Sequence, residues 1–123
     1  MSNILLVDDE QLSVHSLARV LRNERYEIYT ANSVFEAQFL VKSKPIDLIV
    51  SDQQMPGICG IQLLTWTSQN FPNIIRILLT GWATIGNLDE AINQAHIDRF
   101  FQKPCDHETL RSTIQEELLA RRT

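Results

Sequence analysis

Long hydrophobic runs and clustered cysteines are both missing from this chain of 123 residues. No run approaches the roughly 18 apolar residues that a membrane-spanning helix needs, and no basic segment followed by an apolar stretch marks a secretory signal peptide. Its only two cysteines, Cys59 and Cys105, have neither the spacing of metal ligands nor the number that a disulfide framework needs. These absences predict a cytoplasmic protein with reduced cysteines and no membrane segment.

A strong excess of one charge is also absent. The chain has 11 basic and 15 acidic residues, which gives a formal net charge of -4. Because nucleic-acid phosphates attract basic surfaces, this balance argues against direct nucleic-acid binding. No linker, low-complexity tract or internal repeat interrupts the sequence, and its length fits one compact domain. We therefore expect residues 1–123 to form a single domain, either free-standing or excised from a longer protein.

What the sequence does contain is a regular alternation of apolar runs and segments with helical periodicity. Near-continuous β-forming runs, typical of strands buried on both faces, occur at residues 4–7, 26–30, 46–51, 75–79 and 99–102. Apolar stripes with helical spacing lie around residues 14–21, 37–41, 61–71, 88–95 and 110–118. Five β-α units of this kind predict a parallel sheet covered by helices on both faces. Phe35 and Phe39, one helical turn apart, are predicted to be packing residues.

Polar side chains stand where four of the predicted strands end. Asp8 and Asp9 follow the first strand, Asp52 follows the third, Thr80 the fourth and Lys103 the fifth. Ligands of open α/β sheets bind beyond the carboxyl ends of the strands. The sequence therefore predicts that three acids, a hydroxyl and an amine converge on one rim of the sheet.

The run of acids after the first strand needs an explanation, because like charges repel. At about 5 Å and an effective dielectric constant of about 20, each pair of carboxylates costs about 3 kcal/mol. One reading is a solvated helix start, where acids are favoured by the helix dipole, and we assign Glu10 to that role. The other is a cation site, because clustered carboxylates are ligands that suit Mg²⁺. An isolated carboxylate opposite such a site can attack phosphorus and form an aspartyl-phosphate, with lysine, hydroxyl and metal sharing the negative charge.

The acidic pair, the Asp of "SDQQMPG", the Thr of "LLTG" and the Lys-Pro of "FFQKP" together resemble the receiver domain of two-component response regulators, in the CheY-like superfamily. The resemblance covers nearly the whole chain. It implies an α/β, flavodoxin-like, doubly wound sheet of five parallel strands in the order 2-1-3-4-5, with five helices. It also implies a phosphorylation-activated signalling switch in the cytoplasm.

The resemblance assigns chemical roles to the rim. Asp52 is implied to accept a phosphoryl group from a sensor histidine kinase or a phosphotransfer protein. Mg²⁺ is the implied cofactor, with Asp9, Asp52 and the carbonyl of Gln54 as ligands and Asp8 acting through water. Lys103 is implied to contact the phosphoryl group.

The resemblance also implies how the signal leaves the site. Thr80 moves toward the phosphoryl group and Phe100 turns inward, which reshapes the face made by the fourth helix, fifth strand and fifth helix. That face controls a downstream protein or attached output domain, and a homodimer is a further possible partner. The bond before Pro104 is implied to be cis, which only an X-Pro bond adopts readily. From its place two residues after Thr80, Trp82 is expected to slow hydrolysis of the aspartyl-phosphate, as is Gln54 from the opposite loop.

Three other function classes compete with this reading. A pseudo-receiver would have the same fold and bind proteins without being phosphorylated, but Asp52 and Lys103 are intact. An aspartate-nucleophile phosphatase needs a general acid two residues after the nucleophile, where Gln54 cannot serve. A dinucleotide-binding domain needs a Gly-x-Gly-x-x-Gly turn after the first strand, where this chain has acids. We therefore expect no enzyme with an external product, and at most self-phosphorylation from small phosphodonors and self-dephosphorylation.

Overall fold

The computed structural model describes residues 2–22, 25–53, 60–80, 93, 95–103 and 105–121. Its strands are β1 (Asn3–Val7), β2 (Glu27–Ala31), β3 (Leu48–Asp52), β4 (Ile75–Thr80) and β5 (Arg99–Gln102). Its helices are α1 (Gln11–Arg22), α2 (Val34–Ser43), α3 (Gly60–Asn70) and α5 (His107–Arg121). The helix predicted around residues 88–95 lies mostly outside the described residues, so the prediction of five helices is matched by four within them. Gln54, Trp82 and Pro104 also lie outside them.

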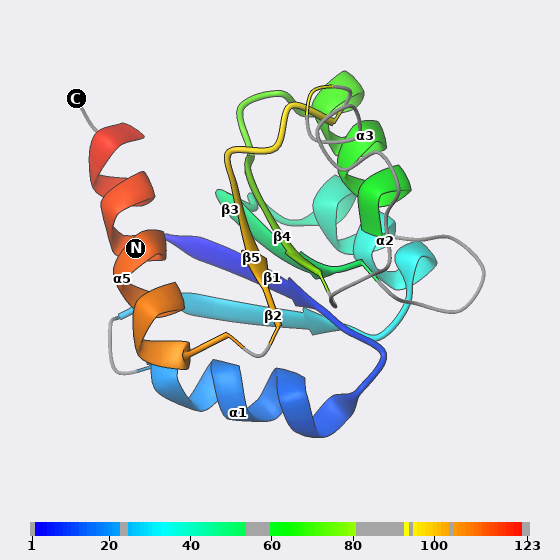
Figure 1. The fold of residues 1–123 in the computed structure, drawn as a ribbon. Helices are drawn as coiled ribbons and strands as arrows, with labels where there is room; N and C mark the ends of the chain where they lie inside the picture. Colours follow the sequence, from blue (N-terminus) through cyan, green and yellow to red (C-terminus); the bar gives the residue numbers. More distant parts are fainter. Residues whose placement is uncertain are drawn as a thin grey trace.

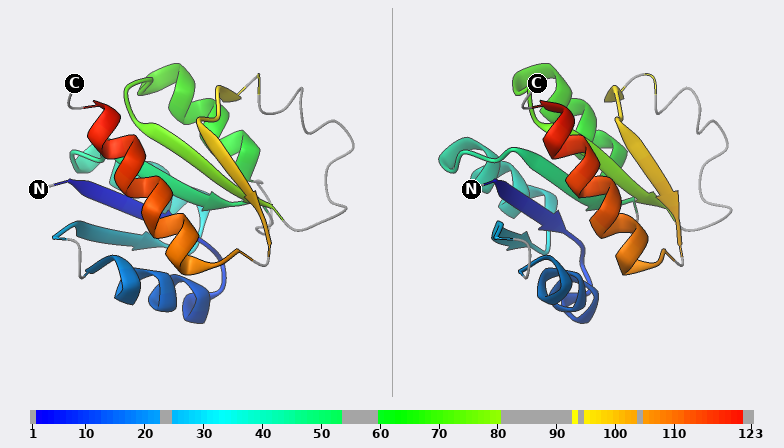
Figure 2. Two further views of the ribbon diagram at one scale, coloured as in Figure 1. Left: turned by 60° about the vertical axis from the view of Figure 1, so that its left-hand side comes forward. Right: turned by 90° about the vertical axis from the view of Figure 1, so that its left-hand side faces the viewer.

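The strands form one parallel sheet in the order β2-β1-β3-β4-β5. This order confirms the flavodoxin-like topology. Helices α1 and α5 cover one face of the sheet, and α2 and α3 cover the other (Figures 1 and 2). Every strand therefore ends at the same rim, which is the condition for the predicted site.

Two hydrophobic cores, one on each face, hold the layers together. Alternate residues of β1 belong to different cores, as the two-residue period of a strand requires. Leu6 packs with Leu17 and Leu110 in the core beneath α1 and α5, whereas Leu5 packs with Leu63 beneath α2 and α3. Burial on both faces explains why the central strands are mainly apolar, with Arg76 of β4 as a charged exception.

The α2 helix corrects one prediction. Its buried residues are Val34, Ala37 and Val41. Successive side chains of a helix are about 100° apart around its axis, so the residues next to this buried stripe point outward. Phe35 and Phe39 are accordingly 75% and 67% exposed, so the prediction that they pack was wrong. Within the described residues, no helix is both long and apolar enough to cross a lipid bilayer.

Candidate functional site

The rim at the carboxyl ends of the strands brings four of the predicted residues together. One carboxylate oxygen each of Asp8, Asp9 and Asp52 lies within 4.8 Å of the others. The Nζ atom of Lys103 is 3.0 Å from Oδ2 of Asp52 and 3.9 Å from Oδ2 of Asp8. Thr80, the last residue of β4, is buried at the same rim.

Backbone hydrogen bonds fix the residues at the strand ends. The N–H of Gln53 donates to the carbonyl of Leu79 at 2.8 Å, and the N–H of Lys103 donates to the carbonyl of Thr80 at 2.7 Å. Each bond links the first residue after a strand to the neighbouring strand. These hydrogen bonds to the sheet therefore fix the backbone at Asp52 and Lys103.

The start of α3 lies against the nucleophile candidate. A side chain at Gly60 would collide with the backbone carbonyl of Asp52, so only glycine fits at this approach. Gln53 holds the contact from the other side, because its side-chain oxygen accepts from the N–H of Ile61 at 2.8 Å and its carbonyl accepts from the N–H of Gly60 at 3.0 Å. The sequence analysis missed Gln53 and Gly60, and the glycine near the predicted helix start was the one available signal.

Comparison with known proteins gives the family. The family of the response regulator receiver domain matches residues 4–115. The chain belongs to this family. This receiver domain is 31% identical over 119 residues to the hydrogenase transcriptional regulatory protein HoxA of Cupriavidus necator, covering 97% of this chain and 24% of that protein. It is 30% identical over 117 residues to the transcriptional regulatory protein GlrR of Escherichia coli K12, covering 95% and 26%. The chain thus spans about a quarter of the length of these curated relatives.

Solved structures give the same assignment. A response regulator receiver domain protein (CheY-like) from Methanospirillum hungatei superposes with a TM-score of 0.92 at 26% identity, covering 99% of this chain and 97% of that one. The signal receiver domain of an HD domain-containing protein from Pseudomonas fluorescens has a TM-score of 0.90 at 30% identity, covering 98% and 89%. The fold and family predicted from the sequence are therefore confirmed.

The acids of this receiver domain carry more negative charge than the lysine offsets. Burial, together with the charge of Asp52, raises the pKa of Asp8 to about 6, against the opposing effects of the Glu10 N–H and of Lys103. The Glu10 N–H donates to Oδ1 of Asp8 at 3.0 Å. Asp9 is exposed, whereas Asp52 is 5% exposed. One ammonium thus faces three carboxylates, two of them buried.

The residues present fit a small divalent cation. Mg²⁺ takes oxygen ligands at about 2.0–2.1 Å and keeps several waters, so it needs only a few carboxylates from the protein. Asp8, Asp9 and Asp52 offer such oxygens close together, and the exposure of Asp9 leaves the site open to solvent. The predicted carbonyl ligand at Gln54 lies outside the described residues.

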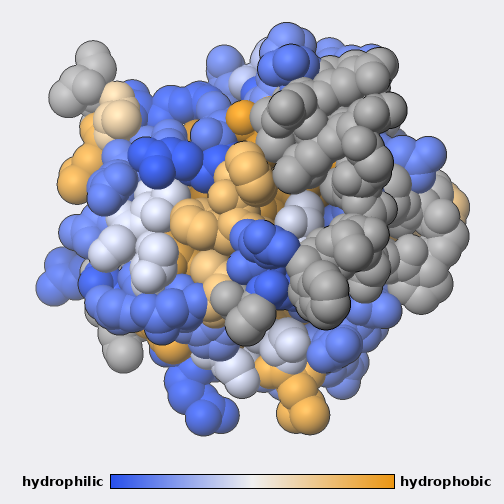
Figure 3. Space-filling model, viewed as in Figure 1, coloured by the Kyte–Doolittle hydropathy of each residue, from blue (hydrophilic) through white to orange (hydrophobic). Residues whose placement is uncertain are grey.

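The predicted switch residues lie on neighbouring strands. β4 pairs with β5 so that Thr80 is opposite Gln102 and Leu78 is opposite Phe100. Thr80 is buried, whereas Phe100 is 45% exposed on the edge strand. Apolar surface gathers over β5 next to hydrophilic α5 (Figure 3). The side chain of Phe100 is thus partly exposed at the edge of the sheet.

Proposed function

We propose that this receiver domain is a switch that is turned on by phosphorylation of Asp52. The observation that carries the proposal is the placement of a buried Asp52 carboxylate 3.0 Å from the Lys103 ammonium and beside two further acids. The phosphoryl donor is a sensor histidine kinase or a phosphotransfer protein. The domain releases no product of its own besides phosphate, which separates it from an enzyme with an external substrate.

The chemistry follows from the carboxylate. An oxygen of Asp52 attacks the phosphorus of a phosphohistidine, so that an O–P bond forms while the P–N bond breaks and the imidazole nitrogen leaves with the electron pair. Before the transfer, the ammonium of Lys103 offsets the charge of Asp52. After the transfer, it contacts an oxygen of the phosphoryl group. Asp9 and Asp52, with Asp8 beside them, would hold Mg²⁺, and the bound cation would offset the charge that the phosphoryl group brings.

The output depends on contacts that differ between the two states. The hydroxyl of Thr80 moves to the phosphoryl group, and Phe100 leaves its exposed position. The face that carries β5 and α5 then changes shape for a downstream protein, an attached output domain or a second copy of the chain. The similarity to transcriptional regulatory proteins four times as long supports an output domain as the controlled element.

Intact mass after incubation with acetyl phosphate tests the proposal. The wild type with Mg²⁺ should gain the mass of one phosphoryl group, and Asp52→Asn should gain none. Glu27→Gln, which removes an exposed acid on β2, is the matched control and should be phosphorylated like the wild type. No mass gain in the wild type, with a second receiver domain phosphorylated in parallel, would favour the pseudo-receiver that binds partners without phosphorylation.

A further inference from the structure

The start of α3 is held by a residue that lies outside the helix and directly after β3. The first four N–H groups of an α-helix have no partner within the helix and need acceptors from elsewhere. In α3, the N–H of Gly60 donates to the carbonyl of Gln53 at 3.0 Å, and the N–H of Ile61 donates to the side-chain oxygen of Gln53 at 2.8 Å. Gln53 directly follows Asp52, the last residue of β3. One residue beside the proposed phosphoacceptor thus accepts the first two N–H groups of α3.

The α2 helix shows the ordinary arrangement for comparison. Its N-cap is Ser33, the residue directly before the helix, whose hydroxyl oxygen accepts from the N–H of Glu36 at 3.2 Å. A local cap of this kind stabilises its own helix. Gln53 and Ile61, by contrast, are eight residues apart in the sequence. The cap of α3 therefore also joins that helix to the end of the strand that carries Asp52.

The same junction fixes the peptide unit between Asp52 and Gln53. Its carbonyl oxygen accepts from the hydroxyl of Ser51 at 3.0 Å, and Gly60 approaches this carbonyl so closely that a side chain there would collide with it. Its N–H donates to the carbonyl of Leu79 on β4 at 2.8 Å. The backbone at Asp52 is therefore held by the sheet on one side and by the start of α3 on the other.

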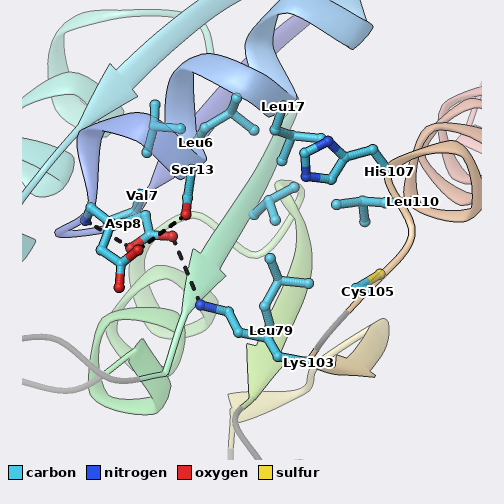
Figure 4. A pocket seen from close by; sticks show the side chains of 13 residues that line it. Leu6, Val7, Asp8, Ser13, Leu17, Leu79, Lys103, Cys105, His107 and Leu110 are labelled. Atoms are coloured by element: carbon cyan, nitrogen blue, oxygen red, sulfur yellow. Dashed lines mark hydrogen bonds and ion pairs between the residues drawn. The ribbon is translucent and has the colours of Figure 1, made fainter.

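Small displacements of the Asp52 carboxylate matter for the proposed chemistry. Its Oδ2 lies 3.0 Å from Nζ of Lys103, and that ammonium also reaches toward Asp8, 3.9 Å from its Oδ2 (Figure 4). Oxygens of Asp8, Asp9 and Asp52 must stay close together to bind one cation, because Mg²⁺ demands near-ideal octahedral geometry. A misplacement of about 1 Å can cost roughly 100-fold in the rate of a reaction. A residue that fixes the Asp52 backbone therefore affects both cation binding and phosphoryl transfer.

We propose that Gln53 is a positioning residue for the chemistry of Asp52. Its two oxygens bind the start of α3, the helix lies against the Asp52 carbonyl through Gly60, and the carboxylate keeps its place for Mg²⁺ and for the phosphoryl group. The role in phosphorylation rests on the proposed function, whereas the role in cation binding is measured without phosphorylation.

Gln53→Leu tests the proposal, because leucine is of similar size but has no oxygen to accept from the N–H of Ile61. Ser33→Ala is the matched control, since it also removes a hydrogen bond at a helix start but leaves β3 and α3 unchanged. Urea titration identifies the conditions in which both variants are folded. Amide hydrogen exchange at Ile61 should accelerate at least ten-fold in Gln53→Leu and not in Ser33→Ala. Wild-type protection of Ile61 in Gln53→Leu would overturn the proposal.

Two further measurements separate positioning from a merely structural role. Calorimetric titration should show Mg²⁺ binding at least five-fold weaker in Gln53→Leu, and phosphorylation by acetyl phosphate should be at least ten-fold slower, with wild-type values in Ser33→Ala. Gln53→Glu keeps an oxygen at the same reach, and a carboxylate is favoured at a helix start. This variant should therefore restore the protection of Ile61 and most of the phosphorylation rate.

The outcomes separate this inference from the proposed function. A folded Gln53→Leu with wild-type Mg²⁺ affinity and phosphorylation rate would overturn the positioning role, as would a Gln53→Glu variant that regains protection of Ile61 but no phosphorylation. A wild type that binds Mg²⁺ but is never phosphorylated would contradict the proposed function. Weaker Mg²⁺ binding by Gln53→Leu would then still support the positioning of Asp52.

Discussion

Both ends of the sheet bury charged side chains, but the groups that surround these charges differ. At the amino end, the guanidinium of Arg76 donates to three backbone carbonyls: twice to His96 at 2.9 and 3.1 Å, once to Ile74 at 2.7 Å and once to Pro72 at 3.2 Å. At the carboxyl end, three carboxylates share the single ammonium of Lys103. Burial opposes the charged form at both ends, lowering the pKa of Arg76 and raising that of Asp8.

The difference lies in charge balance and not in hydrogen bonding. Among the described residues, no buried side-chain nitrogen or oxygen lacks a hydrogen-bond partner. Arg76 donates to neutral carbonyls and lies near the opposite charge of Asp98, so its charge is both hydrogen-bonded and partly offset. The acids repel one another, and a bound cation would relieve that repulsion. The comparison teaches that a buried charge serves the structure when its surroundings satisfy it, and can serve a function when its charge is only partly offset.

Removing the guanidinium of Arg76 at the amino end of the sheet should have the largest effect on stability. Arg76→Met keeps most of the aliphatic stem but leaves the carbonyls of Pro72, Ile74 and His96 without their donor. Buried polar groups without partners are costly, so we expect the free energy of unfolding to fall by about 3 kcal/mol, measured by urea titration. Arg99→Met, which removes an exposed arginine paired with acids of α5, is the control and should cost less than about 1 kcal/mol. Equal losses would mean that the buried carbonyls do not depend on Arg76.

Removing a charge at the carboxyl end of the sheet should instead stabilise the protein. Without divalent cations at pH 7, Asp8→Asn should raise the free energy of unfolding by on the order of 2 kcal/mol, because the amide keeps an oxygen for the Glu10 N–H and carries no charge.

The pH dependence of this gain follows from the raised pKa. Asp8 ordinarily titrates near 3.8 and is raised to about 6 in the folded protein, so its protonated form stabilises the fold below pH about 4 and this contribution is lost as the pH rises through 6. The gain from Asp8→Asn should therefore be present at pH 7 and shrink toward pH 4. A gain that is the same at both values would show that burial does not penalise this carboxylate.

Thr80→Ala should have the smallest effect on stability, about 1 kcal/mol, but a selective effect on signalling. Phosphorylation of Asp52 should proceed, while the amide chemical-shift changes that phosphorylation causes in β5 and α5 should largely disappear. Thr80→Ser keeps the hydroxyl and should restore them. Loss of phosphorylation itself in Thr80→Ala would place the hydroxyl in the chemistry instead of the relay.

The sequence predicted the strands and the acidic rim because both depend on local order. Continuous apolar runs mark the strands, and parallel strands bring whatever follows them to one edge, so Asp8, Asp52 and Lys103 could be grouped before any coordinates. The buried arginine had a signal as well, a single charge within the apolar run of β4, but which atoms would satisfy it depends on His96, twenty residues away.

Other features could not be predicted because they depend on packing between distant segments. The outward direction of Phe35 and Phe39 depends on which stripe of α2 meets the sheet. The contact of Gly60 with Asp52 depends on where α3 begins. Of these, only the Gly60 contact left a local signal, which is the glycine itself near the predicted helix start.

The central claim is that the acids at the carboxyl end form one divalent-cation site, and calorimetric titration with Mg²⁺ at pH 7 tests it most directly. The wild type and the surface control Glu27→Gln should bind one Mg²⁺ saturably, and at a free Mg²⁺ concentration of 100 times Kd the free energy of unfolding should rise by about 2.7 kcal/mol. Asp9→Asn and Asp52→Asn should each weaken binding at least ten-fold and lose most of that rise. Equal binding by all four proteins, or binding by none, would contradict the account.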